Sequence, residues 1–165
     1  MSILLVVLTL LLIGADQLVK YWAVTQLKPV GSIDFIHIGS TELVDLTYLE
    51  NTGAIFGSMS GQRWFLVGFT SLVIVAGIVA MFLSIKRSKF MSVCIMLFVA
   101  GGIGNLIDRI RYGYVVDMFE FRFVKFAIFN VADICVTCAF AAVLIYMIFI
   151  EPKKEKSSRK EKENA

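Results

Sequence analysis

The sequence predicts a mainly α-helical integral membrane protein with four transmembrane helices, a small β-structured region and an aromatic loop on the extracytoplasmic side. Three observations predict this class. The 165 residues are 58% hydrophobic, above the roughly 45–50% of soluble domains. Four apolar runs have the length that a membrane-spanning helix needs, which is about 17–25 residues. The connections between the first and second runs and between the third and fourth runs are polar and rich in β-forming and aromatic residues, unlike the connection between the second and third runs.

The four runs cover about residues 3–24, 64–85, 90–107 and 126–150. The first lacks a basic amino-terminal region and a small-residue cleavage site, so we interpret it as a retained helix and not as a cleaved leader. The second and third contain no charged residue. We expect residues 1–150 to form a single membrane-embedded domain. Residues 151–165 are rich in Lys and Glu, which predicts a disordered cytoplasmic tail.

The distribution of basic residues predicts the orientation. Lys86, Arg87 and Lys89 follow the second run, and six more Lys or Arg lie in the tail. Short loops rich in Lys and Arg stay in the cytoplasm. Four spans place this turn and both termini together, so we expect a multi-pass protein of the cell membrane with both termini cytoplasmic. The opposite side also carries basic residues, which acidic neighbours partly balance: Arg109, Arg111, Arg122 and Lys125.

Two connections then face outward. The first spans residues 28–63, and its segments 33–38 and 42–49 are rich in β-formers and partly alternate, which predicts a small β-structure. The second spans residues 109–125, and its tyrosines and phenylalanines suit the boundary between lipid and water.

Polar residues from distant segments are predicted to share one depth near the outer boundary. Asp16 and Lys20 lie in the outer half of the first run, and Asp133 lies at the outer end of the fourth. Ionisable residues inside a membrane generally face protein or water and mark a function. Each also has a structural interpretation: Asp16 and Lys20 are four residues apart and can form an ion pair, and Asn130 can cap the fourth helix with Asp133 in its first turn.

Several kinds of chemistry are excluded by composition. His37 is the only histidine, and the sequence has no motif for a metal, a dinucleotide or a nucleoside triphosphate. We therefore expect no metal, no cofactor and no nucleic-acid partner. Cys135 and Cys138 lie in an apolar run and are interpreted as packing residues. Carboxylate chemistry remains, in which one aspartate of a close pair keeps its proton while the other is charged. Asp117 and Asp133 are the candidates.

Three other functions stay open at this point. A small transporter or channel subunit could use an Asp/Lys ion path, although the inner halves of the runs are apolar. A non-catalytic lipid-binding scaffold is a second possibility. A peptidase with a Ser/Lys pair, formed by Ser58 or Ser60 with Lys20, is a third.

Five sequence blocks resemble one family. They are Asp16-Gln17-x-x-Lys20, Asn51-Thr52-Gly53-Ala54-Ile55-Phe56, Gly104-Asn105-Leu106-Ile107-Asp108-Arg109, Val115-Val116-Asp117 and Phe129-Asn130-Val131-Ala132-Asp133. Their order on a four-span chain is similar to that of lipoprotein signal peptidase, the bacterial signal peptidase II, a family of membrane aspartyl peptidases. The resemblance covers nearly the whole chain apart from the tail.

The resemblance implies an aspartyl endopeptidase that cuts the signal peptide from a prolipoprotein just before a cysteine carrying diacylglycerol. Its partners would be this precursor and membrane lipids. The shared depth of the polar residues predicts a site near the outer leaflet, and we expect a monomer. Asp117 and Asp133 match the catalytic aspartates. The remaining matched positions would line, brace or support the site: Asp16, Lys20, Asn51, Gly53, Asn105, Asp108, Arg109 and Asn130.

Overall fold

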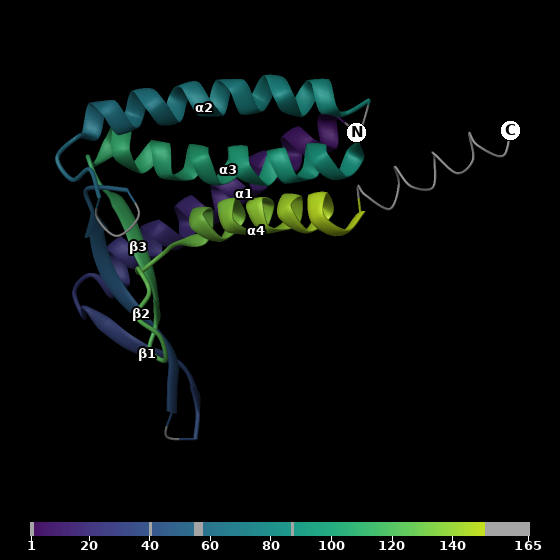
Figure 1. The fold of residues 1–165 in the computed structure, drawn as a ribbon. Helices are drawn as coiled ribbons and strands as arrows, with labels where there is room; N and C mark the ends of the chain where they lie inside the picture. The colour runs from purple at the N-terminus through teal and green to yellow at the C-terminus, as the bar shows by residue number, and fades with distance from the viewer. Residues whose placement is uncertain (1, 40, 55–57, 87, 151–165) are drawn as a thin grey trace, which may run out of the picture.

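The computed structural model describes residues 2–39, 41–54, 58–86 and 88–150. Within these ranges, four helical segments are long and apolar enough to cross a membrane (Figure 1). They are α1 (Ser2–Trp22), which continues as a π-helical turn, η1 (Ala23–Leu27); α2 (Arg63–Ser84); α3 (Lys89–Arg111); and α4 (Val131–Ile145), which continues as η3 (Tyr146–Ile150). Large apolar side chains such as Ile3, Leu72 and Phe140 point outward. The predicted four-helix membrane fold is confirmed.

Two helix boundaries differ from those expected. The third helix continues to Arg111, so Asp108 and Arg109 lie inside it. The fourth begins at Val131, and residues 126–130 are not helical. The reason is that Phe129 pairs with Phe119 as an isolated β-bridge, while a capping box at Asn130 starts the helix one residue later.

Helix α3 is the central element of the bundle. It packs against α1, α2 and α4, and Figure 1 shows it between α2 and α4. Gly101 allows the approach of α4, because a Cβ there would collide with the carbonyl oxygen of Ala132. A Cβ at Gly104 would lie 2.6 Å from Oδ2 of Asp16 on α1. These glycines therefore let α3 pack closely against α4 and α1.

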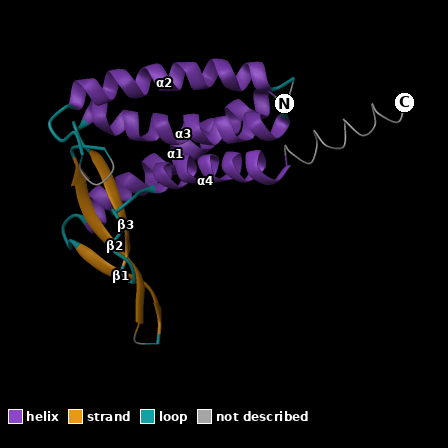
Figure 2. Cartoon of the chain, in the orientation of Figure 1, coloured by secondary structure: helices purple, strands orange, loops and turns teal. Residues whose placement is uncertain are grey.

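A three-stranded antiparallel sheet lies at one end of the bundle (Figure 2). Its strands are β1 (Ser32–Ile38), β2 (Thr41–Asn51) and β3 (Val115–Phe121), in that order. The turn between α2 and α3 and the amino terminus lie at the opposite end (Figure 1). The β-structure expected in residues 33–49 is confirmed. The prediction of an aromatic loop over residues 109–125 is partly wrong, because residues 115–121 form β3 by pairing with β2.

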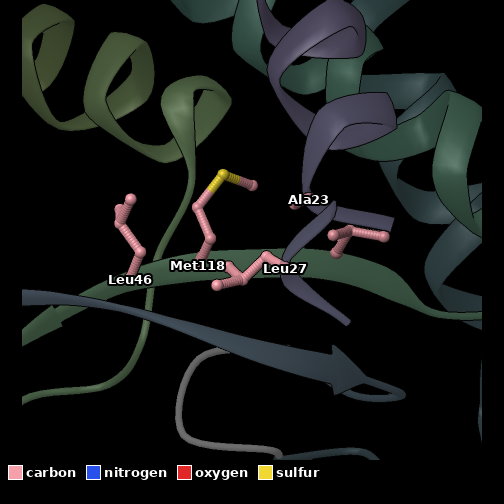
Figure 3. Close-up of a cluster of buried hydrophobic side chains, with 5 residues drawn as sticks. Ala23, Leu27, Leu46 and Met118 are labelled. Carbon is pink, nitrogen blue, oxygen red and sulfur yellow. The ribbon is translucent and has the colours of Figure 1, made fainter. Parts of the chain in front are cut away.

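A small hydrophobic core joins the sheet to the end of α1. It contains Ala23, Leu27, Leu46, Val116 and Met118, all buried, and Figure 3 shows side chains from η1, β2 and β3 meeting there. Val116 and Met118 are fully buried, and they flank the residue between them on β3. This core therefore fixes the position of Asp117 relative to the helices.

Candidate active site

Asp117 lies on β3 opposite Leu49 of β2 and is 2% exposed. Its two carboxylate oxygens each accept one hydrogen bond from an asparagine. Nδ2 of Asn51 donates to Oδ2 at 3.0 Å, and Nδ2 of Asn130 donates to Oδ1 at 2.6 Å. The Asn51 amide is itself oriented, because its Oδ1 accepts from the backbone N–H of Gly53 at 3.0 Å.

Asp133 lies in the first turn of α4, where Asn130 caps the helix. The backbone N–H of Asp133 donates to Oδ1 of Asn130 at 2.9 Å, and the backbone N–H of Asn130 donates to Oδ2 of Asp133 at 3.1 Å. This reciprocal pair is a capping box, which satisfies early backbone donors of a helix. Asn105 of α3 donates to the other oxygen, Oδ1, at 2.8 Å. Because Asn130 bonds both aspartates, it brings the two carboxylates to one place.

A buried ionic cluster lies directly behind this pair. The ammonium group of Lys20 contacts Oδ2 of Asp16 at 3.0 Å and Oδ2 of Asp108 at 3.1 Å, and it donates to Oδ1 of Asn105 at 2.8 Å. The three charged residues are at most 3% exposed. The predicted Asp16–Lys20 pair is present, and Asp108 extends it from α3.

Asp16 and Asp108 also hold backbone atoms of the two segments that carry the aspartates. Oδ1 of Asp16 accepts from the backbone N–H of Ala132 at 2.8 Å, so a residue of α1 caps the start of α4. Oδ2 of Asp108 accepts from the backbone N–H of Val116 at 3.1 Å. The cluster thus fixes both Asp133 and Asp117 through their neighbours in the chain.

Arg109 and Gly53 meet at the edge of the site. Nη2 of Arg109 donates to the carbonyl oxygen of Gly53 at 2.8 Å, which ties α3 to the segment after β2. Arg63, at the start of α2, donates to the carbonyl oxygens of Arg109 at 2.8 Å and Ile110 at 2.7 Å. It therefore satisfies open acceptors at the carboxyl end of α3.

The sequence prediction assigned no role to Arg63 or Gln17. Gln17 donates to Oδ1 of Asp108 at 3.1 Å and to the carbonyl oxygen of Gly104 at 3.2 Å. The position of Gln17 next to Asp16 was the available signal. Arg63 gave no comparable signal, because an arginine at the end of an apolar run is common at the membrane boundary.

A cavity of about 460 Å³ opens at the two carboxylates. Its polar wall contains five of the predicted site residues: Asn51, Asn105, Arg109, Asp117 and Asp133. The rest of its lining is mostly apolar and includes Val115, Phe121, Phe126, Ile128, Phe129 and Ile134. The other predicted residues stand behind this wall or brace its edge: Asp16, Lys20, Gly53, Asp108 and Asn130. All ten predicted residues therefore lie in one connected region.

The environment of Asp117 changes its acidity. Burial and, secondly, the negative charge of Asp133 raise the pKa of the Asp117 carboxyl from 3.8 to about 6. The hydrogen bonds from Asn51 and Asn130 and the charge of Lys20 act in the opposite direction and do not outweigh them. An aspartate with this pKa can exchange a proton near neutral pH.

The cysteines differ from one another in environment. Cys94 and Cys135 are buried, so the predicted packing role of Cys135 is confirmed. The same prediction for Cys138 is wrong, because Cys138 is exposed and lines the cavity. Across the described ranges of the chain, no group of three or more His, Cys, Asp or Glu side chains is arranged to hold a metal ion. The Ser/Lys alternative gains no support, since two carboxylates enclose the ammonium of Lys20 and the hydroxyl of Ser60 pairs with Thr52 at 2.6 Å.

Solved structures with this fold define the class of protein. One bacterial membrane enzyme, determined by the in meso method at 2.3 Å resolution, is 29% identical with a TM-score of 0.73, covering 87% of each chain. Another, at 1.9 Å, is also 29% identical with a TM-score of 0.71, covering 88% of this chain and 93% of that one. The present chain thus has the fold of a multi-pass bacterial membrane enzyme.

Sequence relatives define the family. The model of the signal peptidase II family matches residues 8–149. A lipoprotein signal peptidase of Clostridioides difficile is 37% identical over 149 residues, covering 90% of this chain and 97% of the relative. One from Streptococcus pneumoniae is 41% identical over 142 residues, covering 86% and 90%. The chain belongs to the signal peptidase II family, and the transporter alternative is not favoured.

Proposed function

We propose that this protein is an aspartic endopeptidase that removes the signal peptide from diacylglyceryl-modified prolipoproteins, cleaving just before the lipid-modified cysteine. Asp117 and Asp133 would be its catalytic residues. The observation that supports this most is that Asn130 bonds both carboxylates, through Nδ2 to Asp117 at 2.6 Å and through its backbone N–H to Asp133 at 3.1 Å. Both aspartates also line one cavity.

The chemistry follows from a carboxylate pair that shares one proton. The ionised aspartate takes a proton from a water molecule, whose oxygen forms a bond to the carbonyl carbon of the peptide. The protonated aspartate donates to the carbonyl oxygen. One hydroxyl of the tetrahedral species then gives its proton to the ionised aspartate while the protonated aspartate donates to the leaving nitrogen. The C–N bond breaks, and the pair again holds one proton. Such a pair titrates as a unit, so neither Asp117 nor Asp133 is assigned the proton.

The surrounding amides keep the pair in position without neutralising it. Each carboxylate oxygen accepts one hydrogen bond from an asparagine, which leaves a lone pair of each oxygen for water or substrate. The Arg109 guanidinium lines the same cavity and keeps donor capacity beyond its bond to Gly53. It is suited to bind carbonyl groups of the substrate backbone or of the lipid-modified residue.

The cavity fits a substrate that is part peptide and part lipid. Its polar wall faces a peptide bond, while its phenylalanine and isoleucine side chains suit acyl chains or apolar residues. We place both termini in the cytoplasm and the catalytic pair near the outer leaflet, which Lys86 and Lys89 at the opposite turn support. A cleavage point at this depth is reached without extracting the acyl chains from the membrane. We expect a monomer to suffice, because one chain supplies both aspartates.

The test compares purified wild type with Asp117→Asn and Asp133→Asn on a diacylated precursor and on the same precursor without lipid. We expect wild type to cleave the diacylated form preferentially and each variant to lose at least about 10³-fold in kcat. Asp34→Asn, on exposed β1, is the matched control and should cleave like wild type. Full activity of either dyad variant would refute the assignment of the pair, and equal cleavage of both precursors would refute the lipid requirement.

A further inference from the structure

Arg63, the first residue of α2, holds the last turn of α3 from outside the candidate site. Its Nε donates to the carbonyl oxygen of Arg109 at 2.8 Å, and its Nη2 donates to that of Ile110 at 2.7 Å. Carbonyl groups at the end of a helix lack the regular partners of its interior. A planar guanidinium can hold two neighbouring acceptors because its donors have a fixed geometry. Arg63 therefore fixes both the position and the direction of this turn.

A continuous series of hydrogen bonds leads from this turn to Asp117. Nη2 of Arg109 donates to the carbonyl oxygen of Gly53 at 2.8 Å. The backbone N–H of Gly53 donates to Oδ1 of Asn51 at 3.0 Å, and Nδ2 of Asn51 donates to Oδ2 of Asp117 at 3.0 Å. Because the backbone N–H of Gly53 can only donate, it holds the oxygen end of the Asn51 amide and turns the nitrogen end toward the carboxylate.

The side chain of Arg63 also contacts the turn that joins α3 to β3. Gly113 has a φ of +84° in this turn, and its N–H donates to the carbonyl oxygen of Arg109 at 3.2 Å. A Cβ at Gly113 would lie 3.3 Å from Nη1 of Arg63, so the guanidinium lies directly against the turn. β3, which carries Asp117, begins two residues later. One side chain thus contacts the beginning of both connections to Asp117, the hydrogen-bonded series and the strand.

We propose that Arg63 is a positioning residue, which holds the last turn of α3 so that the Asn51 amide stays directed at Asp117. The proposal rests on the proposed function, in which Asp117 is one of the two catalytic residues. Arg63 does not line the cavity, so it acts through Asn51 and not on the substrate. A hydrogen bond to the charged carboxylate favours that form. Misalignment of the Asn51 amide should therefore make Asp117 less acidic.

The acidity of Asp117 depends on several neighbours besides Asn51. Burial and the charge of Asp133 raise the pKa of its carboxyl group, and the hydrogen bond from Asn51 lowers it. The charged groups that act on Asp117 come from three helices and include Asp133 on α4, Lys20 on α1 and Arg109 on α3. A test must therefore separate the alignment of the amide from a plain change in nearby charge.

The pH dependence of cleavage makes this separation. We expect Arg63→Gln to move the alkaline limb of the kcat profile upward by about half a unit and to lower kcat about tenfold. Arg63→Lys keeps the charge but cannot hold two carbonyl groups as a fork, so it should give a similar shift. Arg111→Gln removes a charge from an exposed position in the same turn and should leave the profile unchanged.

Three outcomes of this experiment would overturn the proposal. The first is an unshifted profile in Arg63→Gln, which would mean that the amide keeps its alignment without the arginine. The second is an equal shift in Arg111→Gln, and the third is a wild-type profile in Arg63→Lys. Either of the last two would mean that only the positive charge matters.

A measurement without cleavage separates this proposal from the proposed function. Between about pH 5 and pH 8, the thermal midpoint reports proton binding by Asp117. The folded Arg63→Gln variant should bind this proton more tightly, so its midpoint should fall by more than that of wild type as the pH rises. The extra fall should disappear in an Asp117→Asn background, because a merely structural role would lower the midpoint equally at every pH.

The two measurements together assign a failure to one proposal or the other. If wild type does not cleave a diacylated precursor but the extra fall is present, the proposed function fails and the positioning of Asp117 by Arg63 stands. If wild type cleaves the precursor and the extra fall is absent, or persists in the Asp117→Asn background, the positioning role of Arg63 fails alone.

Discussion

Asn105 donates its side-chain N–H to Oδ1 of Asp133 at 2.8 Å while its own Oδ1 accepts from Lys20 at 2.8 Å. The lysine therefore decides which end of the amide faces the aspartate, since an ammonium group can only donate. The amide nitrogen must then point to Asp133. A cation outside the cavity thus orients a hydrogen bond inside it.

Replacing this amide by a carboxylate removes the donor and adds a negative charge. We expect Asn105→Asp to lower kcat about 100-fold, because hydrogen bonds to charged groups are worth about 1.5–3 kcal/mol. The measurement is cleavage of a diacylated precursor by purified protein. Gln26→Glu makes the same change at an exposed position of η1 and should retain wild-type kcat. Retention of activity by Asn105→Asp would contradict a role for its donor.

Lys20 and Lys28 are both ion-paired but differ in burial. Lys20 is 3% exposed between two carboxylates, whereas Lys28 pairs with Glu50 at 2.7 Å on the surface. We expect Lys20→Met to lower the free energy of unfolding by about 3–5 kcal/mol, since it leaves buried charges unpaired. Lys28→Met should leave it nearly unchanged, since water screens an exposed ion pair. Unfolding in detergent measures both, and equal effects would contradict the dependence on burial.

Gly101 is predicted to tolerate no side chain. A Cβ there meets the carbonyl oxygen of Ala132, a backbone atom that cannot rotate away. Gly101→Ala should push α4 from α3, displace Asp133, lower the thermal midpoint and reduce cleavage. Gly68→Ala is the matched control on α2, because a Cβ there has no atom within 4 Å, and it should be neutral or stabilising by up to about 1 kcal/mol. Similar behaviour of the two variants would argue against close packing at Gly101.

The acidity of Asp117 predicts a pH dependence of stability. Its pKa of about 6 in the folded protein lies above the value of about 3.9 for an unfolded chain. The folded state therefore binds this proton more tightly, so its contribution to stability is greatest below about pH 4, falls between about pH 4 and 6, and stays low above. Between about pH 5 and pH 8, the thermal midpoint of wild type should fall by more than that of Asp117→Asn. Parallel curves would contradict the raised pKa.

The orientation is tested by labelling from one side of the membrane. Lys86 is exposed at the turn between α2 and α3, whereas Ser88 caps α3 by accepting from the backbone N–H of Met91. In a Cys138→Ser background, Lys86→Cys should react with an impermeant maleimide only from the cytoplasm. Asp34→Cys, on the sheet at the other end, should react only from outside. The reverse pattern would invert the orientation and move the candidate site to the inner leaflet.

The elements that depend on local rules were predictable from the order of residues along the chain. The number and approximate positions of the four helices follow from the apolar runs, the cap of α4 follows from Asn130 and Asp133 three residues apart, and the Asp16–Lys20 pair follows from a spacing of four. The sequence blocks also contain the ten predicted site residues, which meet in one region of the structure. These features are predictable because their physical causes act between residues close in the chain.

The tertiary structure alone decided which side chains bond across the chain. Asn51 reaches Asp117 over 66 positions, and Asp16 reaches the backbone of Ala132 over 116. It also decided that Asp117 lies on a strand, because β3 exists only where β2 supplies its backbone partners. Neither periodicity nor capping contains information about such pairings, since they depend on how α3 packs against three other elements at once. The site is therefore a property of that packing, although its residues are legible in the sequence.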